Sequence, residues 1–128
     1  MKFLIDTHLL IWAAQASQKL SAHTREMLDD KRNSLFFSAA SIWEISFKFA
    51  RGRPDFEINP KLLRDELLKN GYAEVTITGE HAIAVMELPG IHKDPFDKLL
   101  IAQAKLEGMI LLTADATLAR YPGPIMLA

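Results

Sequence analysis

The sequence predicts an α/β fold, a three-layer sandwich in which helices cover both faces of a small, mostly parallel sheet. Short apolar runs of strand length alternate along the chain with longer segments that have the periodicity of helices. Strands separated by helices need crossover connections, which make neighbouring strands parallel. The chain has 128 residues, of which 49% are hydrophobic, so we expect a single domain spanning residues 1–128.

The expected strands are mostly uninterrupted apolar runs, as in sheets buried on both faces. They cover residues 2–5, 35–37, 73–77 and 109–112, with residues 125–127 as a candidate last strand. Capping residues and helix stops delimit the helices: Asn59-Pro60 and Asp94-Pro95 each place a cap before a proline, and Gly108 is a stop signal. Caps included, the expected helices cover residues 8–14, 21–31, 38–49, 59–70, 78–86, 94–107 and 116–119.

Composition argues against several classes of function. The chain has no cysteine, which excludes disulfides, thiolate zinc sites and thiol nucleophiles and fits a reducing cytoplasm. Its net charge of −1 is unlike the positive excess of a passive nucleic-acid clamp, but it weighs less against an enzyme that holds a metal. An acid follows only three apolar residues near the start, so no signal peptide is expected. No apolar run approaches the ~18 residues of a membrane helix.

Four carboxylates fall where a parallel sheet gathers functional groups, beyond the carboxyl ends of its strands. Asp6 follows the first strand, Asp115 follows the fourth, and Asp97 lies in the first turn of the helix before the fourth strand. Glu44 lies in a strongly apolar helix, where a charge is costly to bury without a partner. The alternatives are a helix cap for Asp6, a solvated helix face for Glu44, a capping box for Asp97 and an ordinary loop position for Asp115.

Clustered carboxylates repel one another unless a cation neutralises them. Oxygen ligands without cysteine, and without histidines at ligand spacing, favour Mg²⁺ or Mn²⁺. Such a site suits hydrolysis of phosphodiesters by a water that the metal activates. Asp94 is expected to cap a helix and is a candidate further ligand. His92, close to Asp94 and Asp97, is the histidine expected near the site, and His8, His23 and His81 are expected at the surface or at helix ends.

The sequence lacks the motifs of serine hydrolases and of nucleotide-binding proteins. No serine lies in a GxSxG motif, and the chain has neither a Walker loop nor GxGxxG. The tryptophans Trp12 and Trp43, at helical positions, are expected in the core, with an interface as the alternative. The basic residues near the acids are candidate phosphate contacts or simply solvated surface. These residues are Lys48, Arg51, Arg53, Lys93 and Lys98.

Four segments resemble the PIN-domain family and, more narrowly, the VapC-like toxins of toxin–antitoxin pairs. They are FLIDTH at residues 3–8, SIWEI at 41–45, HKDPFDKLLIAQA at 92–104 and LTAD at 112–115. The third is long and specific, the motifs follow the family order, and the resemblance covers essentially the whole chain. It implies a PIN-like fold, a homodimer, and inhibition by a cognate antitoxin that reaches into the acidic groove.

The resemblance also assigns residues. Asp6, Glu44 and Asp97 match the core acids of the family and Asp115 its variable fourth acid, while Thr7 and Thr113 match supporting hydroxyls. The resulting prediction is a toxin that is an Mg²⁺- or Mn²⁺-dependent endoribonuclease.

The residues leave three alternatives to that prediction. One is a regulatory protein that binds nucleic acid or an antitoxin without cleaving, and another is a nuclease for single-stranded DNA. A receiver or phosphatase would need a second acid beside Asp6, where the chain has Thr7 and His8 instead.

Overall fold

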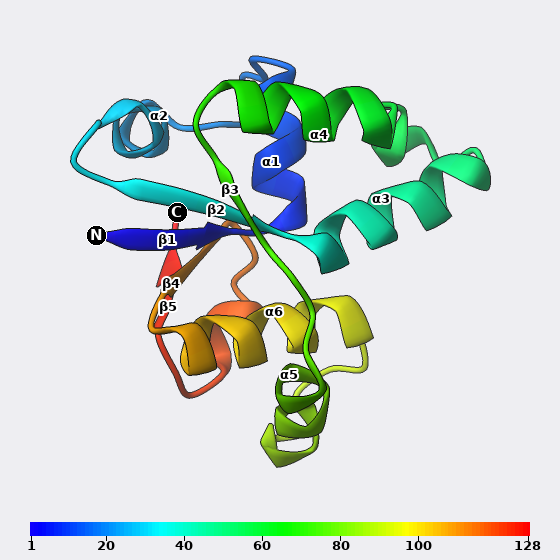
Figure 1. The fold of residues 1–128 in the computed structure, drawn as a ribbon, viewed down its shortest axis with the longest axis vertical. Coiled ribbons are helices and arrows are strands. Elements are labelled where there is room, and N and C mark those ends of the chain that lie inside the picture. Colours follow the sequence, from blue (N-terminus) through cyan, green and yellow to red (C-terminus); the bar gives the residue numbers. More distant parts are fainter.

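The computed structural model describes residues 1–128, apart from the side chain of Asp55, and contains a five-stranded sheet (Figure 1). The strands are β1 (Lys2–Ile5), β2 (Ser34–Ser38), β3 (Ala73–Val75), β4 (Ile110–Thr113) and β5 (Ile125–Leu127). Their order in the sheet is β3-β2-β1-β4-β5, and all four pairings are parallel. The predicted α/β class and parallel sheet are therefore confirmed.

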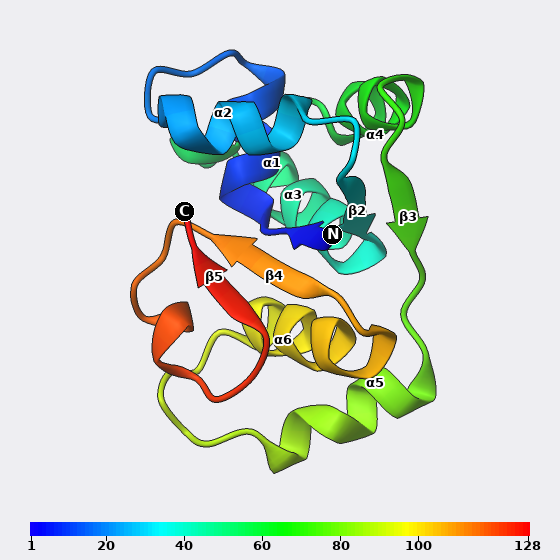
Figure 2. The ribbon, with the colours of Figure 1, turned by 90° about the vertical axis from the view of Figure 1, so that its left-hand side faces the viewer.

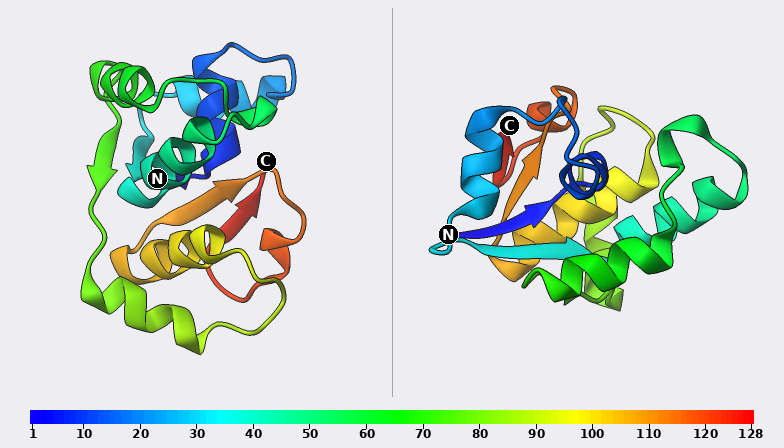
Figure 3. Two further views of the ribbon diagram at one scale, coloured as in Figure 1. Left: turned by 90° about the vertical axis from the view of Figure 1, so that its right-hand side faces the viewer. Right: turned by 90° about the horizontal axis from the view of Figure 1, so that it is seen from above.

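Helices form a layer on each face of this sheet (Figures 1 and 2). The α-helices are α1 (Thr7–Ala14), α2 (Ala22–Asp29), α3 (Ala39–Ala50), α4 (Pro60–Lys69), α5 (Gly79–Ala84) and α6 (Pro95–Glu107). The short 3-10 helices are η1 (Pro54–Phe56), η2 (Val85–Glu87) and η3 (Leu118–Arg120). The helices α1, α2 and α4 lie on one side and α5 and α6 on the other, and α3 contacts both α1 and α6 (Figure 3). Within the described residues, no helix has the length and apolarity needed to cross a membrane.

The central strand β1 supplies side chains to two hydrophobic cores because neighbouring residues of a strand point to opposite faces. Phe3 and Ile5 pack with α1, α3 and α4, whereas Leu4 packs with α6. The paired strand β4 follows the same rule, with Leu111 in the α6 core and Leu112 in the other. Both cores are thus built on strands that are buried on both faces.

Most expected boundaries hold to within one or two residues, and the exceptions have local causes. The third strand ends at Val75 rather than residue 77, because Thr76 to Thr78 leave the sheet to enter α5. The helix expected over residues 78–86 is divided into α5 and η2. The caps work as predicted: the side chains of Ser21, Ser38, Asn59, Thr78 and Asp94 all accept backbone N–H groups.

A buried polar network joins β2, the β3–α5 connection and α6. Ser38 donates to Oε1 of Gln103 at 2.5 Å, and Nε2 of Gln103 donates to the carbonyl of Thr76 at 3.2 Å. His81 accepts the Thr78 N–H on Nδ1, which leaves Nε2–H to donate to Glu107 at 2.9 Å. His81 therefore lies at a helix end as expected, but it is buried rather than on the surface. Gln103 is the member of this network that ties α6 to the start of α3.

Replacing Gln103 should test how much that tie stabilises the fold. Gln103→Leu leaves the buried Ser38 hydroxyl without its acceptor and the Thr76 carbonyl without its donor. We expect the free energy of unfolding to fall by about 1–3 kcal/mol, the cost of an unsatisfied buried polar group. Urea denaturation measures it, with Gln18→Leu at an exposed position as the control. Equal stability of the two variants would contradict the expectation.

Candidate active site

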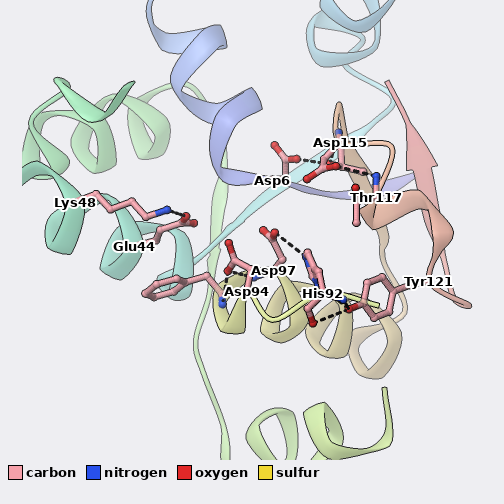
Figure 4. A network of polar contacts seen from close by, with 11 residues as sticks. Asp6, Glu44, Lys48, His92, Asp94, Asp97, Asp115, Thr117 and Tyr121 are labelled. Carbon is pink, nitrogen blue, oxygen red and sulfur yellow. Dashed lines mark hydrogen bonds and ion pairs between the residues drawn. The ribbon is translucent and has the colours of Figure 1, made fainter. Parts of the chain in front are cut away.

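The candidate acidic side chains lie near the carboxyl edge of the sheet (Figure 4). Asp6 directly follows β1 and continues its pairing, since its N–H donates to the carbonyl of Leu112 in β4 at 3.0 Å. Thr113 ends β4 beside it, and Ser38 ends β2 on the other side and caps α3. Parallel pairing thus brings three chain segments, remote in sequence, to one edge.

Asp6 is a buried carboxylate, 5% exposed, with two hydrogen bonds. Its Oδ1 accepts the N–H of Leu9 at 2.9 Å, so Asp6 does cap α1, and its Oδ2 accepts the hydroxyl proton of Thr113. Burial raises the pKa of Asp6 against the effect of these hydrogen bonds, and the nearby charge of Asp115 adds to the rise. The cap and the acidic site are therefore two roles of the same residue.

Glu44 is 3% exposed, so the solvated-face interpretation was wrong. One carboxylate oxygen, Oε2, accepts from Nζ of Lys48 one turn later at 2.7 Å. The other, Oε1, is buried and has no hydrogen-bond partner among the described residues. The preceding turn is fixed by Ser41, which accepts the hydroxyl proton of Thr7 at 2.9 Å. That bond sets the helix carrying Glu44 against the helix that Asp6 caps.

Asp97, in the first turn of α6, faces a histidine that the sequence singled out. Oδ2 of Asp97 lies 3.1 Å from Nε2 of His92, and Nδ1 of His92 lies 2.7 Å from the Tyr121 hydroxyl. That hydroxyl also accepts the His92 backbone N–H at 3.1 Å. Burial, followed by the charge of Asp94 and with a contribution from Glu44, raises the pKa of Asp97 from 3.8 to about 7. Tyr121 was not predicted, because nothing in its local sequence relates it to a histidine 29 positions away.

Asp94 and Asp115 each satisfy backbone groups as well as carrying charge near the site. Oδ1 of Asp94 accepts from Phe96 at 2.9 Å and from Asp97 at 3.1 Å, the expected N-cap. Oδ1 of Asp115 accepts from Thr117 at 2.8 Å, which closes a turn two residues on. Each uses one oxygen for these bonds, so the loop interpretation of Asp115 is compatible with a role beside Asp6.

Figure 4 shows Asp97 between Glu44 and His92, with Asp115 next to Asp6. Among the described residues, no three acid or histidine side chains form a group that could hold a metal ion. Lys48, Thr113 and His92 each contact one of the carboxylates. The chemistry of the group nevertheless fits a divalent cation. All its donors are carboxylate oxygens, two of its acids have raised pKa values, and one oxygen of Glu44 is buried without a partner.

The basic and aromatic residues named from the sequence differ in their exposure and in their contacts. Lys48 is tied to Glu44, and the Arg51 guanidinium stacks on the Phe47 ring at 5.2 Å. Trp43 is 57% exposed, so its expected place in the core was wrong, and its ring meets that of Phe96 edge-on at 4.9 Å. The other three candidate phosphate contacts are Arg53 and Lys93, both exposed, and Lys98, which is half-buried.

Comparison with known proteins places the chain in a family. The family model described as "PIN domain" matches residues 3–124. The chain belongs to the PIN-domain family. PIN domains are nucleases, and this domain carries its acids at the edge of the sheet described above. No curated protein sequence matches the chain.

Three solved structures support the same fold. VapBC2 from Rickettsia felis, bound to a DNA fragment from its promoter, has a TM-score of 0.74 at 16% identity, covering 99% of this chain and 98% of that one. DNA-bound VapBC from Salmonella typhimurium has a TM-score of 0.70 at 18% identity, covering 98% and 97%. VapBC-1 from nontypeable Haemophilus influenzae has a TM-score of 0.61 at 17% identity, covering 94% and 91%. Because the sequence identities are this low, the three structures show only that this chain shares their fold.

The raised pKa of Asp97 predicts an unusual dependence of stability on pH in metal-free protein. The folded state holds this proton up to about pH 7, whereas an unfolded chain releases it near pH 4. Between these values the folded state binds more protons, so ionisation of Asp97 lowers the free energy of unfolding as the pH rises. Asp97→Asn should remove that loss, and its stability relative to wild type should therefore increase from about pH 4 to about pH 7.

Urea denaturation in EDTA at several pH values measures this difference. Asp65→Asn, at an exposed position of α4, is the matched control and should show no such trend. A difference between Asp97→Asn and wild type that stays constant across the pH range would show that Asp97 ionises normally in the folded protein.

Proposed function

We propose that this PIN domain is an Mg²⁺- or Mn²⁺-dependent endoribonuclease and the toxin of a toxin–antitoxin pair. The observation that carries the proposal is the set of acids at one edge of the sheet: Asp6 and Glu44 are buried, and Asp97 is half-buried. The exposed Asp115 lies next to Asp6. A divalent cation held there would supply the positive charge that activates a water molecule and offsets charge on the phosphate. The family resemblance of the motifs supports RNA as the substrate.

The residues around the acids would orient them and receive the substrate. Thr113 holds Asp6 by its hydroxyl, and the Tyr121–His92 pair holds Asp97 from the other side. The candidate phosphate contacts, which include Arg51 at the C-cap of α3, would position the nucleic-acid backbone without reading its sequence. In this scheme the chain supplies ligands and orientation.

The partners in this proposal are a cognate antitoxin and a second copy of the chain. The VapBC assemblies whose fold the chain shares support an antitoxin, and the sequence resemblance implies both partners. Trp43 and Phe47, both exposed on α3, are apolar enough for a protein interface. The cytoplasm would be the place of action.

The deciding experiment is cleavage of mixed RNA and of single-stranded DNA by purified protein with Mg²⁺, Mn²⁺ or EDTA. We expect metal-dependent cleavage of RNA that Asp6→Asn and Glu44→Gln each reduce at least about 100-fold, because each removes a charged ligand of the cation. Asp65→Asn should retain activity. Cleavage of DNA alone would reassign the substrate, and no cleavage by folded, antitoxin-free wild type would favour the binding protein without nuclease activity.

A further inference from the structure

The ion pair between Lys48 and Glu44 is unusually enclosed for two residues one helical turn apart. Nζ of Lys48 lies 2.7 Å from Oε2 of Glu44, and the two side chains are 20% and 3% exposed. Pairs of this kind on helix surfaces contribute little, because water screens both charges. Here Glu44 is removed from water, so the ammonium is the cation that the protein itself provides to this carboxylate.

The environment of Lys48 gives its ammonium a second favourable contact. Nζ lies 4.7 Å from the centre of the Phe56 ring, a cation–π contact with η1. Phe56 is itself fully buried and belongs to the hydrophobic core, so its position is fixed. Release of the Glu44 carboxylate would therefore leave the ammonium at the Phe56 ring, at the rim of the acidic site.

Only one of the two carboxylate oxygens of Glu44 takes part in this ion pair. Its Oε1 is buried and has no hydrogen-bond partner among the described residues, and its charge contributes to the raised pKa of Asp97. Burying a charged oxygen without a hydrogen-bond partner costs free energy, and a bound cation would offset that cost. Oε1 of Glu44 and the carboxylate of Asp97 are therefore the groups that a cation other than the Lys48 ammonium would bind.

We propose that Lys48 is a built-in counter-ion of Glu44 that a divalent cation displaces. Because the ammonium and the divalent cation need the same carboxylate charge, they compete: Lys48 stabilises the metal-free fold and weakens metal binding. The displaced ammonium, still beside the Phe56 ring, would be available to a substrate phosphate. This inference depends on the proposed metal dependence of the site.

The test uses Lys48→Met, which keeps much of the side-chain length and removes the charge. With EDTA present, we expect its melting temperature to fall by about 5 °C or more, because Glu44 is left buried and unpaired. By calorimetric titration, we expect Mg²⁺ and Mn²⁺ to bind at least roughly fivefold more tightly than to wild type. Lys48→Arg, which retains the charge, should stay close to wild type in both measurements.

Two further variants separate the ion pair from general effects. Lys98→Met removes a positive charge next to Asp97 in sequence and breaks no ion pair among the described residues, so it should change metal affinity much less than Lys48→Met. In a Glu44→Gln background, Lys48→Met should cost little stability, because no buried charge remains to be neutralised.

If Lys48→Met folds only when Mn²⁺ is added, as seen by circular dichroism, the inference is supported. Failure to fold with Mn²⁺ and in the Glu44→Gln background overturns it.

The outcomes for the two proposals are distinct. If wild type binds neither Mg²⁺ nor Mn²⁺, the metal-dependent function is wrong and the inference falls with it. If wild type binds metal but Lys48→Met binds no more tightly, or loses no stability in EDTA, only the role of Lys48 is overturned. A gain in affinity for Lys98→Met as large as that for Lys48→Met also overturns it, because the effect is then long-range electrostatics.

Discussion

The organisation of this PIN domain follows from the cost of placing several negative charges side by side away from water. Parallel pairing of β1 with its neighbours brings Asp6 to the edge where α3 and α6 also present their acids. Each carboxylate is then held by a different kind of partner: the Thr113 hydroxyl for Asp6, the Lys48 ammonium for Glu44 and the His92 ring for Asp97. These contacts offset the desolvation and repulsion that the acids impose on the fold.

The partners also connect the layers, so the fold and the site stabilise one another. Thr7 and Ser41 join α1 to α3, and Ser38 and Gln103 join the start of α3 to α6. Because α3 contacts helices from both layers, a shift of either layer would move Glu44 relative to the other acids. The polar contacts in the interior therefore set the spacing of the charged groups at the edge.

The fold, and with it the edge of the sheet at which the candidate acids lie, could be predicted because local signals in the sequence determine the strands and helices. Apolar runs, caps such as Asn59-Pro60 and the stop at Gly108 located the elements, and parallel topology implied where their carboxyl ends meet. Contacts between segments that are remote in sequence could not be predicted, because no local signal determines them. The bond from Tyr121 to His92 joins two loops, and the exposure of Trp43 depends on how α3 is rotated against its neighbours, which helical spacing alone does not fix.

The hydrogen bond between Thr113 and Asp6 joins positions 107 residues apart, and it has a consequence for synthesis of the chain. The strand β4 completes the pairing of β1 and is also where Thr113 lies. A nascent chain that has Asp6 and Glu44 in place still lacks α6 and β4, so these acids have neither their neighbours nor their scaffold. The acidic edge can assemble only after synthesis has passed Thr113, and translation products that end before this residue cannot form it.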